Sequence, residues 1–262
     1  MKNKIRSYAL SLGLSQFGVC EPEPHRQALV FLFPYYCGEH PGNISLYARG
    51  SDYHVVAKKY LLKICEYIKD ITQKDFSGEI FCDISPYNDK ELARMAGLGF
   101  YGKNTLLINP QLGSYFFIGY IVTEGLDLTL DSPMEEQCKG CNACLNACPG
   151  SAIDENGVNI GRCLSDISQK KGELLPEEKQ IFLWGDYIWG CDRCQQVCPH
   201  NRDISPCPLP EFSTNLLHFL NLEDIEALSE KQFREKYKDR AFTWRGKKTL
   251  QRNILLKTEV NK

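Results

Sequence analysis

The stretch that decides the fold reads Cys138-Lys-Gly-Cys141-Asn-Ala-Cys144-Leu-Asn-Ala-Cys148-Pro149, and a second stretch reads Cys191-Asp-Arg-Cys194-Gln-Gln-Val-Cys198-Pro199. The first has the spacing of bacterial ferredoxins, in which three cysteines bind one 4Fe–4S cluster and the fourth binds the other cluster. The second lacks a first cysteine, and Cys163 is the other cysteine of the module that can replace it. We therefore predict two 4Fe–4S clusters. Their predicted ligands are Cys138, Cys141, Cys144 and Cys198 for one cluster, and Cys148, Cys163, Cys191 and Cys194 for the other.

Structural zinc is the alternative for these cysteines, but zinc sites usually present separated pairs without a third cysteine at the same spacing. The chain holds thirteen cysteines, of which eight lie between residues 138 and 198. No convincing signal peptide precedes them, because serines interrupt the apolar residues near the start. We expect a reducing cytoplasm, where clustered cysteines indicate metal. The remaining cysteines are expected in the core: Cys20, Cys37, Cys65, Cys82 and Cys207.

The charge of the chain is unevenly distributed. The 262 residues have a formal net charge of −2, but residues 231–262 carry +8 and the remainder carries −10. A basic tail favours a polyanionic partner, while a solvated helical face is the alternative interpretation. Apolar runs are far shorter than the ~20 residues that cross a bilayer, so we predict no membrane association.

The hydrophobic pattern predicts an α/β (α+β) domain over residues 1–130, then the ferredoxin-like two-cluster module over 131–210, then a short helical basic segment over 211–262. In the first domain the apolar spacing of Ile5, Tyr8, Ala9 and Leu12 predicts a helix. A second helix is expected from Asp52 onward, with Asp52 as its N-cap and Val55, Val56, Leu61, Ile64, Ile68 and Ile71 as apolar positions. Strands are predicted at 27–36, 79–83, 105–108 and 115–123, with a helix at 89–96.

Several further motifs give the chain a specific resemblance. They are Tyr47-Ala-Arg-Gly-Ser-Asp-Tyr-His54, Asp83-Ile-Ser-Pro, Ala93-Arg-Met-Ala-Gly-Leu-Gly-Phe-Tyr-Gly-Lys-Asn104 and Thr243-Trp-Arg-Gly-Lys-Lys-Thr-Leu-Gln-Arg-Asn253. With the cysteine runs, they occur in the order typical of the epoxyqueuosine reductase family, which is related to reductive dehalogenases. The sequence resembles a short form of that family, without the C-terminal helical repeats of longer members.

The resemblance implies a cofactor and a reaction. The N-terminal domain would bind cobalamin without a protein ligand on the lower face of the cobalt. The reaction would convert epoxyqueuosine to queuosine at the wobble position of tRNA, with an external low-potential electron donor. Asp83 would be the proton donor. Cobalamin contacts would come from Ser45, Asp52, His54, Asp83, Leu107, Ile118, Ser165 and Asp192. Contacts with the tRNA anticodon stem-loop would come from Lys171, Arg245, Lys247, Lys248 and Arg252.

Two other functions remain open from the sequence: a cobalamin-dependent or iron–sulfur reductase of a small molecule, and a ferredoxin-like electron carrier. For the enzyme, Asp83 must hold a proton near neutral pH, whereas a free aspartate is ionised there. We expect burial beside Ile80, Phe81 and Ile84, away from basic side chains, to raise the pKa of Asp83.

Overall fold

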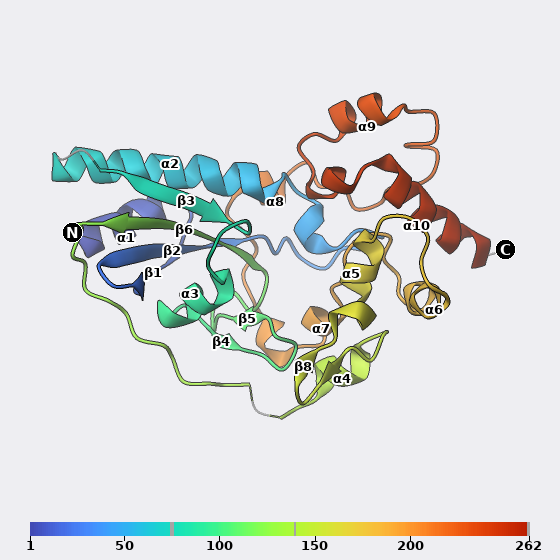
Figure 1. Ribbon diagram of the computed structural model, residues 1–262, viewed down its shortest axis with the longest axis horizontal. Helices are drawn as coiled ribbons and strands as arrows, with labels where there is room; N and C mark the ends of the chain where they lie inside the picture. Colours follow the sequence, from blue (N-terminus) through green and yellow to red (C-terminus); the bar gives the residue numbers. More distant parts are fainter. Residues whose placement is uncertain (74–75, 139, 261–262) are drawn as a thin grey trace.

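The centre of the computed structural model, which describes residues 1–73, 76–138 and 140–260, is a four-stranded sheet in the order β1-β2-β6-β3. All neighbouring strands are antiparallel, and β2 pairs with β6 over its whole length, from Arg26 opposite Glu124 to Pro34 opposite Phe116. The sheet therefore has the long central pair β2–β6 and the edge strands β1 and β3 (Figure 1). The bounds are β1 Gln16–Glu23, β2 Arg26–Pro34, β3 Gly78–Cys82 and β6 Phe116–Glu124.

Both faces of the sheet are buried. Successive residues of a strand point to opposite faces, so Leu29, Phe31 and Phe33 of β2 join the core beneath α1 and α2. The alternate residues, Ala28 and Val30 among them, join the core beneath α3 and the hairpin β4–β5. Figure 1 shows the same layers, with the sheet between its helices. The bounds are α1 Lys2–Ser11, α2 Tyr53–Thr72, α3 Asp89–Met95, β4 Phe100–Tyr101 and β5 Leu107–Ile108.

The long helix α2 begins where the sequence predicts. Asp52 is its N-cap and accepts a hydrogen bond from the backbone N–H of His54, which satisfies a donor at the helix start. Leu61, Ile64 and Ile68 are buried against the sheet. Val55 was expected on this apolar face, but it is 66% exposed, because it lies on the solvent side of the first turn. The other expected elements of the first domain are present, with their ends shifted by one to three residues.

Strand β1 is absent from the sequence prediction. Its apolar stretch is short, and it contains Gly18 and Pro22, which are rare in strands. Gly18 is required here because a Cβ at this position would lie 2.1 Å from the carbonyl oxygen of Ala96. The end of α3 therefore packs directly on the backbone of β1.

The cysteine module is built from short elements joined by turns. It lies beyond the β4–β5 end of the sheet domain (Figure 1). Its two-stranded hairpin β7–β8 separates the first cysteine run from Cys163. The bounds are α4 Ala143–Ala147, β7 Ile153–Asp154, β8 Gly157–Val158, α5 Leu164–Gln169, α6 Pro176–Trp184 and α7 Arg193–Gln196.

The C-terminal segment is helical in part, with turns and loops over residues 214–229. Phe233, Phe242 and Leu250 share a buried cluster with Ile44 and Trp189, so this segment fixes the start of the second cysteine run. Cys207 and Leu209, which precede the C-terminal segment, and Phe212 at its start belong to the core under α2. The three predicted segments therefore share their cores. The bounds are α8 Pro210–Ser213, α9 Glu230–Lys236 and α10 Lys247–Val260. Within the described residues, no helix is long and apolar enough to span a membrane.

Candidate active site and cluster-binding module

Four cysteines surround a small cavity near the surface of the module. The cavity has a volume of about 120 Å³, and Cys138, Cys141, Cys144 and Cys198 all line it. We name this group the outer cysteines, because Cys141 is exposed and the others are half-buried. The first three come from the loop before α4 and from α4 itself, while Cys198 follows α7. The chain thus brings together one set of four thiols that the spacing predicts.

The second set of four, the inner cysteines, lines part of a larger cavity. Cys148, Cys163, Cys191 and Cys194 face this space of about 370 Å³. Burial raises the pKa of Cys191 to about 12, and negative charge on its neighbours Asp192, Cys163 and Cys148 adds to the rise. Four thiolates at this position therefore need a positively charged partner such as iron to stay deprotonated. In the described chain, no three Cys, His, Asp or Glu side chains converge on a single-ion position.

Each cysteine run contributes its last member to the other set. Cys148 follows Cys144 in the chain but lines the inner cavity, and Cys198 follows Cys194 but lines the outer one. This exchange is the arrangement of two-cluster ferredoxins. Both cavities have walls of four thiols from different segments, which suits a cluster with four metal corners.

Asp83 lines a third cavity, of about 480 Å³, which we call the aspartate cavity. The aspartate cavity and the inner cavity share five wall residues, so they adjoin. Tyr53 and Phe117, whose ring centroids are 4.3 Å apart in a stacked pair, also line the aspartate cavity. A broad ligand with apolar faces would lie between Asp83 and the inner cysteines. The shared wall consists of Tyr35, Tyr47, Lys90, Leu106 and Phe116.

Asp83 is the first residue after β3 and has a left-handed backbone, with φ of +67°. Its N–H donates a 2.9 Å hydrogen bond to Asp89 Oδ2 at the start of α3. That carboxylate also accepts at Oδ1 from the hydroxyl of Tyr120. The turn that carries Asp83 is therefore held between the sheet and α3, and the Asp83 side chain reaches the cavity.

The predicted environment of Asp83 is wrong. Ile84 is 81% exposed and forms no apolar pocket around the carboxylate. Instead, Oδ2 of Asp83 lies 3.3 Å from Nε2 of His54 and accepts a 3.1 Å hydrogen bond from Tyr53. The hydrogen bond from His54 lowers the pKa of Asp83 below its ordinary value, although burial acts in the opposite direction. The structure therefore pairs this carboxylate with a base that the sequence prediction kept away from it.

His54 is held between two carboxylates. Its Nδ1 lies 2.8 Å from Oδ1 of Asp52, and its Nε2 faces Asp83. The hydrogen bonds to Asp52 and then to Asp83 raise the pKa of His54 to about 9. Burial raises the pKa of Asp52, but the hydrogen bonds from His54 outweigh it and bring the pKa below the ordinary value. At neutral pH the site holds an imidazolium between two carboxylates.

The remaining predicted cofactor contacts divide into two groups. Ile118 lines the aspartate cavity, and Ser45 and Ser165 line the inner cavity. Four others are outside the described lining residues of both cavities: Asp52, His54, Leu107 and Asp192. Leu107 is buried beneath α3, and its neighbour Leu106 faces both cavities, since adjacent strand residues point in opposite directions.

Asp192 supports the wall rather than forming it. It is fully buried, and its carboxylate accepts hydrogen bonds from the hydroxyl of Ser45 at 2.6 Å and the N–H of Leu46 at 2.8 Å. Gly190, at φ +70°, permits this approach, because a Cβ there would lie 2.5 Å from the Ser45 Cβ. The second cysteine run is thus attached to the loop before α2.

The predicted tRNA contacts also divide. Lys171 and Lys248 are exposed, and the Arg245 guanidinium lies over the Trp244 ring at 3.6 Å. Lys247 instead donates to the carbonyls of Glu226 and Leu228. Arg252 donates to Lys170 and Gly172 and also to its neighbour Asn253. For Lys247 and Arg252 the structure thus shows an internal role.

Sequence reasoning missed most of the cavity wall. Tyr35, Tyr47 and Phe116 belong to apolar stretches that look like ordinary core in the sequence, and only the fold shows that they face a cavity. Lys90 follows Asp89, whose carboxylate accepts a hydrogen bond from the N–H of Asp83. The ammonium group of Lys90 donates a hydrogen bond to the carbonyl of Thr105. A lysine that borders both cavities was detectable only as one charge in a helix.

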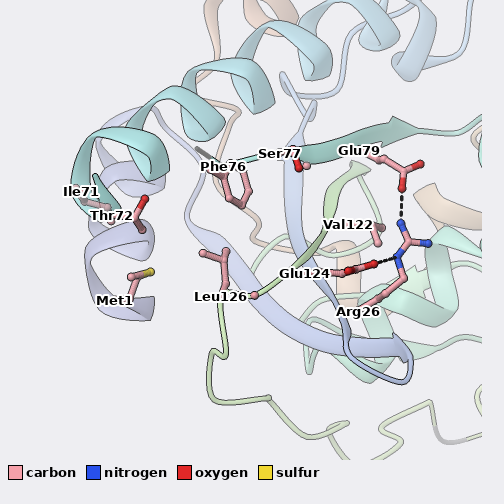
Figure 2. Close-up of a pocket in the computed structure, with 12 residues that line it drawn as sticks. Met1, Arg26, Ile71, Thr72, Phe76, Ser77, Glu79, Val122, Glu124 and Leu126 are labelled. Carbon is pink, nitrogen blue, oxygen red and sulfur yellow. Dashed lines mark hydrogen bonds and ion pairs between the residues drawn. The ribbon is translucent and has the colours of Figure 1, made fainter. Parts of the chain in front are cut away.

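A larger cavity, of about 580 Å³, lies where β3 begins, whereas Asp83 follows the other end of that strand. Figure 2 shows the residues that line it. There Arg26 forms ion pairs with Glu79 and Glu124 across β2, β3 and β6. The charges of this cavity pair with each other, and none of its described lining residues is a cysteine. We therefore place the candidate site at the two adjoining cavities, where the chemically distinctive residues meet.

Two family descriptions match parts of the chain. Residues 20–84 match "Epoxyqueuosine reductase QueG, DUF1730", and residues 137–201 match "4Fe-4S double cluster binding domain". The epoxyqueuosine reductase of Leadbetterella byssophila is 37% identical over 221 residues, which are 84% of this chain and 72% of that protein. That of Bacillus cereus is 36% identical over 222 residues, 84% of this chain and 57% of that protein. The chain thus spans little more than half the length of several curated relatives.

Solved structures agree with the sequence matches. Epoxyqueuosine reductase with an epoxyqueuosine-modified tRNA stem loop superposes with a TM-score of 0.82 at 27% identity, over 98% of this chain and 80% of that one. The Bacillus subtilis enzyme, solved with its catalytic aspartate loop swung out of the active site, gives 0.80 at 26% identity, with the same coverage. A reductive dehalogenase studied for B12-dependent dehalogenation shares the fold, with a TM-score of 0.50 at 16% identity, over 98% of this chain and 36% of that one.

Proposed function

The chain belongs to the epoxyqueuosine reductase family, and from this premise we propose that it reduces epoxyqueuosine to queuosine at the wobble position of tRNA. The observation that carries the proposal is the wall shared by the aspartate cavity and the inner cavity. Because of this shared wall, Asp83, as proton donor, and the inner cysteines, as part of an electron-transfer module, would act on one bound substrate. A ferredoxin-like carrier needs the module but has no use for the aspartate cavity.

The chain's residues suit the two kinds of cofactor that the reaction requires. The outer and inner cysteines would each hold a 4Fe–4S cluster. Cobalamin would lie in the adjoining cavities against the shared aromatic wall, and when bound it would supply a strongly reducing cobalt centre. Among the described residues that line these cavities there is no histidine.

Asp83 would protonate the departing oxygen. It lies at the open end of the aspartate cavity, and its side chain is 60% exposed, so a substrate that enters from solvent meets it. Support also comes from the Bacillus subtilis relative, whose catalytic aspartate lies on a loop that swings out of the site. A positioned acid contributes roughly 10²–10⁴-fold to the rate of such a step.

The tRNA would bind across α10 and the loop after α5. Arg252 attaches the carbonyls of Lys170 and Gly172 to α10, so the exposed Lys171 lies beside the basic helix. Lys171, Lys248 and Arg245 would contact the backbone phosphates. The wobble base of an anticodon loop is unpaired and is therefore cheap to extrude into a pocket. A tRNA substrate and a low-potential electron donor would place the enzyme in the cytoplasm.

The decisive experiment is anaerobic reconstitution with iron, sulfide and cobalamin, followed by an assay on tRNA that carries epoxyqueuosine, with a viologen or dithionite as reductant. Conversion to queuosine, detected by mass spectrometry of the nucleosides, supports the proposal. A protein that binds both kinds of cofactor and is re-oxidised by small epoxides or halides, but leaves the tRNA unchanged, is the small-molecule reductase instead. A protein that binds clusters but no cobalamin is an electron carrier.

A further inference from the structure

A chain of three side chains runs from the aspartate cavity to solvent. Asp83 lines the cavity, and His54 lies behind it, outside the described lining residues. Oδ2 of Asp83 is 3.3 Å from Nε2 of His54, and Nδ1 of His54 is 2.8 Å from Oδ1 of Asp52. The His54 side chain is 38% exposed. His54 therefore contacts solvent on one side and the carboxylate at the cavity on the other.

The orientation of the His54 ring is fixed by its neighbours. Asp52, the N-cap of α2, accepts a hydrogen bond from the backbone N–H of His54 and also faces its Nδ1. The Tyr53 ring stacks on the His54 ring at 4.1 Å and on Phe117 at 4.3 Å. With Nδ1 held by a carboxylate, the imidazolium presents its Nε2 proton to Asp83. These contacts make a directed pair rather than a surface histidine.

The proposed reaction needs more protons than Asp83 can store. Reduction of an epoxide to an alkene breaks both C–O bonds and forms one C=C bond. It takes up two electrons and two protons, and the oxygen leaves as water. The electrons come from the external low-potential reductant of the proposed function. Both protons go to the same oxygen, and one carboxyl group holds only one proton at a time. Asp83 must therefore be reloaded within each turnover, while the substrate in the aspartate cavity covers it from solvent.

We propose that His54 is the proton relay of this site: it takes protons from solvent and passes them through Nε2 to Oδ2 of Asp83. This inference rests on the proposed function. In it Asp83 remains the group that touches the substrate, His54 acts through Asp83, and Asp52 positions the ring. The resemblance to the family implies a cofactor contact for His54, and its contact with Oδ2 of Asp83 supports a relay role.

The charges around His54 favour a stored proton. The groups that face it or its partner Asp83 are acids or neutral phenols and thiols from α2, β3, α3 and the loop before α2. The raised pKa of His54, about 9, follows from this environment. At neutral pH the proton therefore resides on His54, next to an ionised Asp83. Its transfer to Oδ2 of Asp83 is completed when the negatively charged oxygen of the opened epoxide takes the proton from that carboxyl group. The titratable neighbours are Asp52, Asp83, Asp89, Tyr47, Tyr53 and Cys82.

The first test compares reconstituted wild-type enzyme with His54→Gln and with His25→Asn, a control that removes an exposed histidine at the β1–β2 turn. Glutamine can keep hydrogen bonds to both carboxylates, but it cannot carry a proton. We expect His54→Gln to lower kcat by roughly tenfold or more, with an unchanged KM for tRNA. The loss of wild-type activity above a pH of about 9 should disappear in His54→Gln and persist in the control. A His54→Gln enzyme with the wild-type rate and pH profile overturns the relay.

Chemical rescue distinguishes proton transfer from a structural role. His54→Ala leaves a gap that opens to solvent, and added imidazole should restore part of kcat in proportion to its protonated fraction. Cluster content and cobalamin binding should be equal in all variants. Restoration of activity by N-methylated quaternary imidazolium, which has no transferable proton, would overturn the relay.

The second test needs no turnover. In ¹⁵N-histidine-labelled, cluster-loaded protein, the ring of His54 should titrate with a pKa near 9, and Asp83→Asn should move that pKa toward the ordinary value of about 6.5. A His54 pKa that Asp83→Asn leaves unchanged overturns the relay even if the enzyme is active, because Nε2 would then not face the Asp83 carboxylate. A pKa near 9 in a wild-type protein that leaves epoxyqueuosine unreduced counts against the proposed function instead.

Discussion

Oδ1 of Asp192 accepts a 2.6 Å hydrogen bond from the hydroxyl of Ser45, a residue 147 positions earlier in the chain. The bond connects the second cysteine run to the loop that leads into α2, and both partners are fully buried. The position of the inner cysteines relative to Asp83 depends on such connections. The stability of the module and the shape of the cavities are therefore linked.

Replacement of Asp192 by Asn should destabilise the protein. The amide oxygen can still accept from the N–H of Leu46, but the NH₂ group must then occupy the place of Oδ1, where it can donate to the Ser45 hydroxyl. Nε2 of Gln195, which donates to Oδ1 of Asp192, then faces a second donor, so one buried hydrogen bond is lost. We expect a loss of about 1–3 kcal/mol in the free energy of unfolding, or several degrees in Tm. Anaerobic thermal unfolding measures this. Asp203→Asn, at an exposed position after the same cysteine run, is the control, and equal Tm values for the two variants would contradict the prediction.

Replacement of Cys163 by Ala should remove one cluster. The anaerobically reconstituted wild-type protein should hold about eight irons, and the variant about four, since Cys163 lines only the inner cavity. Iron and sulfide analysis with electron paramagnetic resonance of the reduced protein checks this result. Cys37→Ala changes a half-buried cysteine outside both sets and should keep all the iron. Full iron content in Cys163→Ala would show that the ligand assignment is wrong.

Replacement of Asp83 by Asn should abolish most turnover. The variant keeps the size of the side chain and loses the transferable proton, so the rate should fall by roughly 10²–10⁴-fold. Iron content should remain, because Asp83 is outside the described lining of both cysteine cavities. Cobalamin binding and affinity for tRNA should also remain, because asparagine has the size of the aspartate that lines the aspartate cavity. Single-turnover assays with epoxyqueuosine tRNA measure the loss. If the rate stays within a few-fold of wild type, Asp83 is a turn residue and another group is the acid.

The double variant Lys171→Glu/Lys248→Glu should weaken tRNA binding. Both lysines are exposed, and each phosphate contact contributes about 0.7–0.9 to the salt dependence of the logarithm of the binding constant. Affinity measured at several salt concentrations should fall and should show a smaller slope. Lys4→Glu on α1, at the other end of the molecule in Figure 1, is the control. An unchanged slope in the double variant would show that these lysines belong to a solvated surface that does not contact tRNA.

The contacts of His54 with Asp52 and Asp83 should also make the free energy of unfolding depend on pH. The pKa of His54 is raised, so its contribution is complete below pH about 6.5 and is lost as the pH rises through about 9. The pKa values of Asp52 and Asp83 are lowered, so their contribution is lost in acid. The Tm difference between wild type and His54→Gln should therefore be largest near neutral pH. The corresponding difference in the free energy of unfolding should be small, below about 1 kcal/mol, because the side chains are partly exposed. A pH-independent difference would contradict this.

The cysteine sets were predictable because the number of residues between ligands directly limits which thiols can meet around one cluster. The partner of Asp83 was not predictable in this way. The contact with His54 joins residues 29 positions apart, and it exists because the start of α2 lies beside the end of β3. The sequence pattern predicts Asp52 as the N-cap of α2, and the structure confirms it. A cap pattern gives no information on a contact between His54 and the distant carboxylate of Asp83.

Errors elsewhere have equally local causes. The resemblance implies a cofactor contact for Leu107, whereas its neighbour Leu106 lines both cavities and Leu107 belongs to the core beneath α3. Lys247 and Arg252 looked like phosphate ligands because charge is visible in a sequence, whereas the backbone carbonyls that hold them are not. Strand β1 was missed because Gly18 serves close packing against Ala96 rather than strand propensity.

The exchange of Cys148 and Cys198 between the two sets has a consequence for damage and repair. Each cavity depends on a thiol that the other run holds in place, so neither half of the module is a self-contained unit. Oxygen that attacks at the exposed Cys141 would release Cys198 and, with it, the chain segment that carries Cys194. Loss of the outer cluster would thus destabilise the inner cluster, and repair would require that both clusters be assembled together.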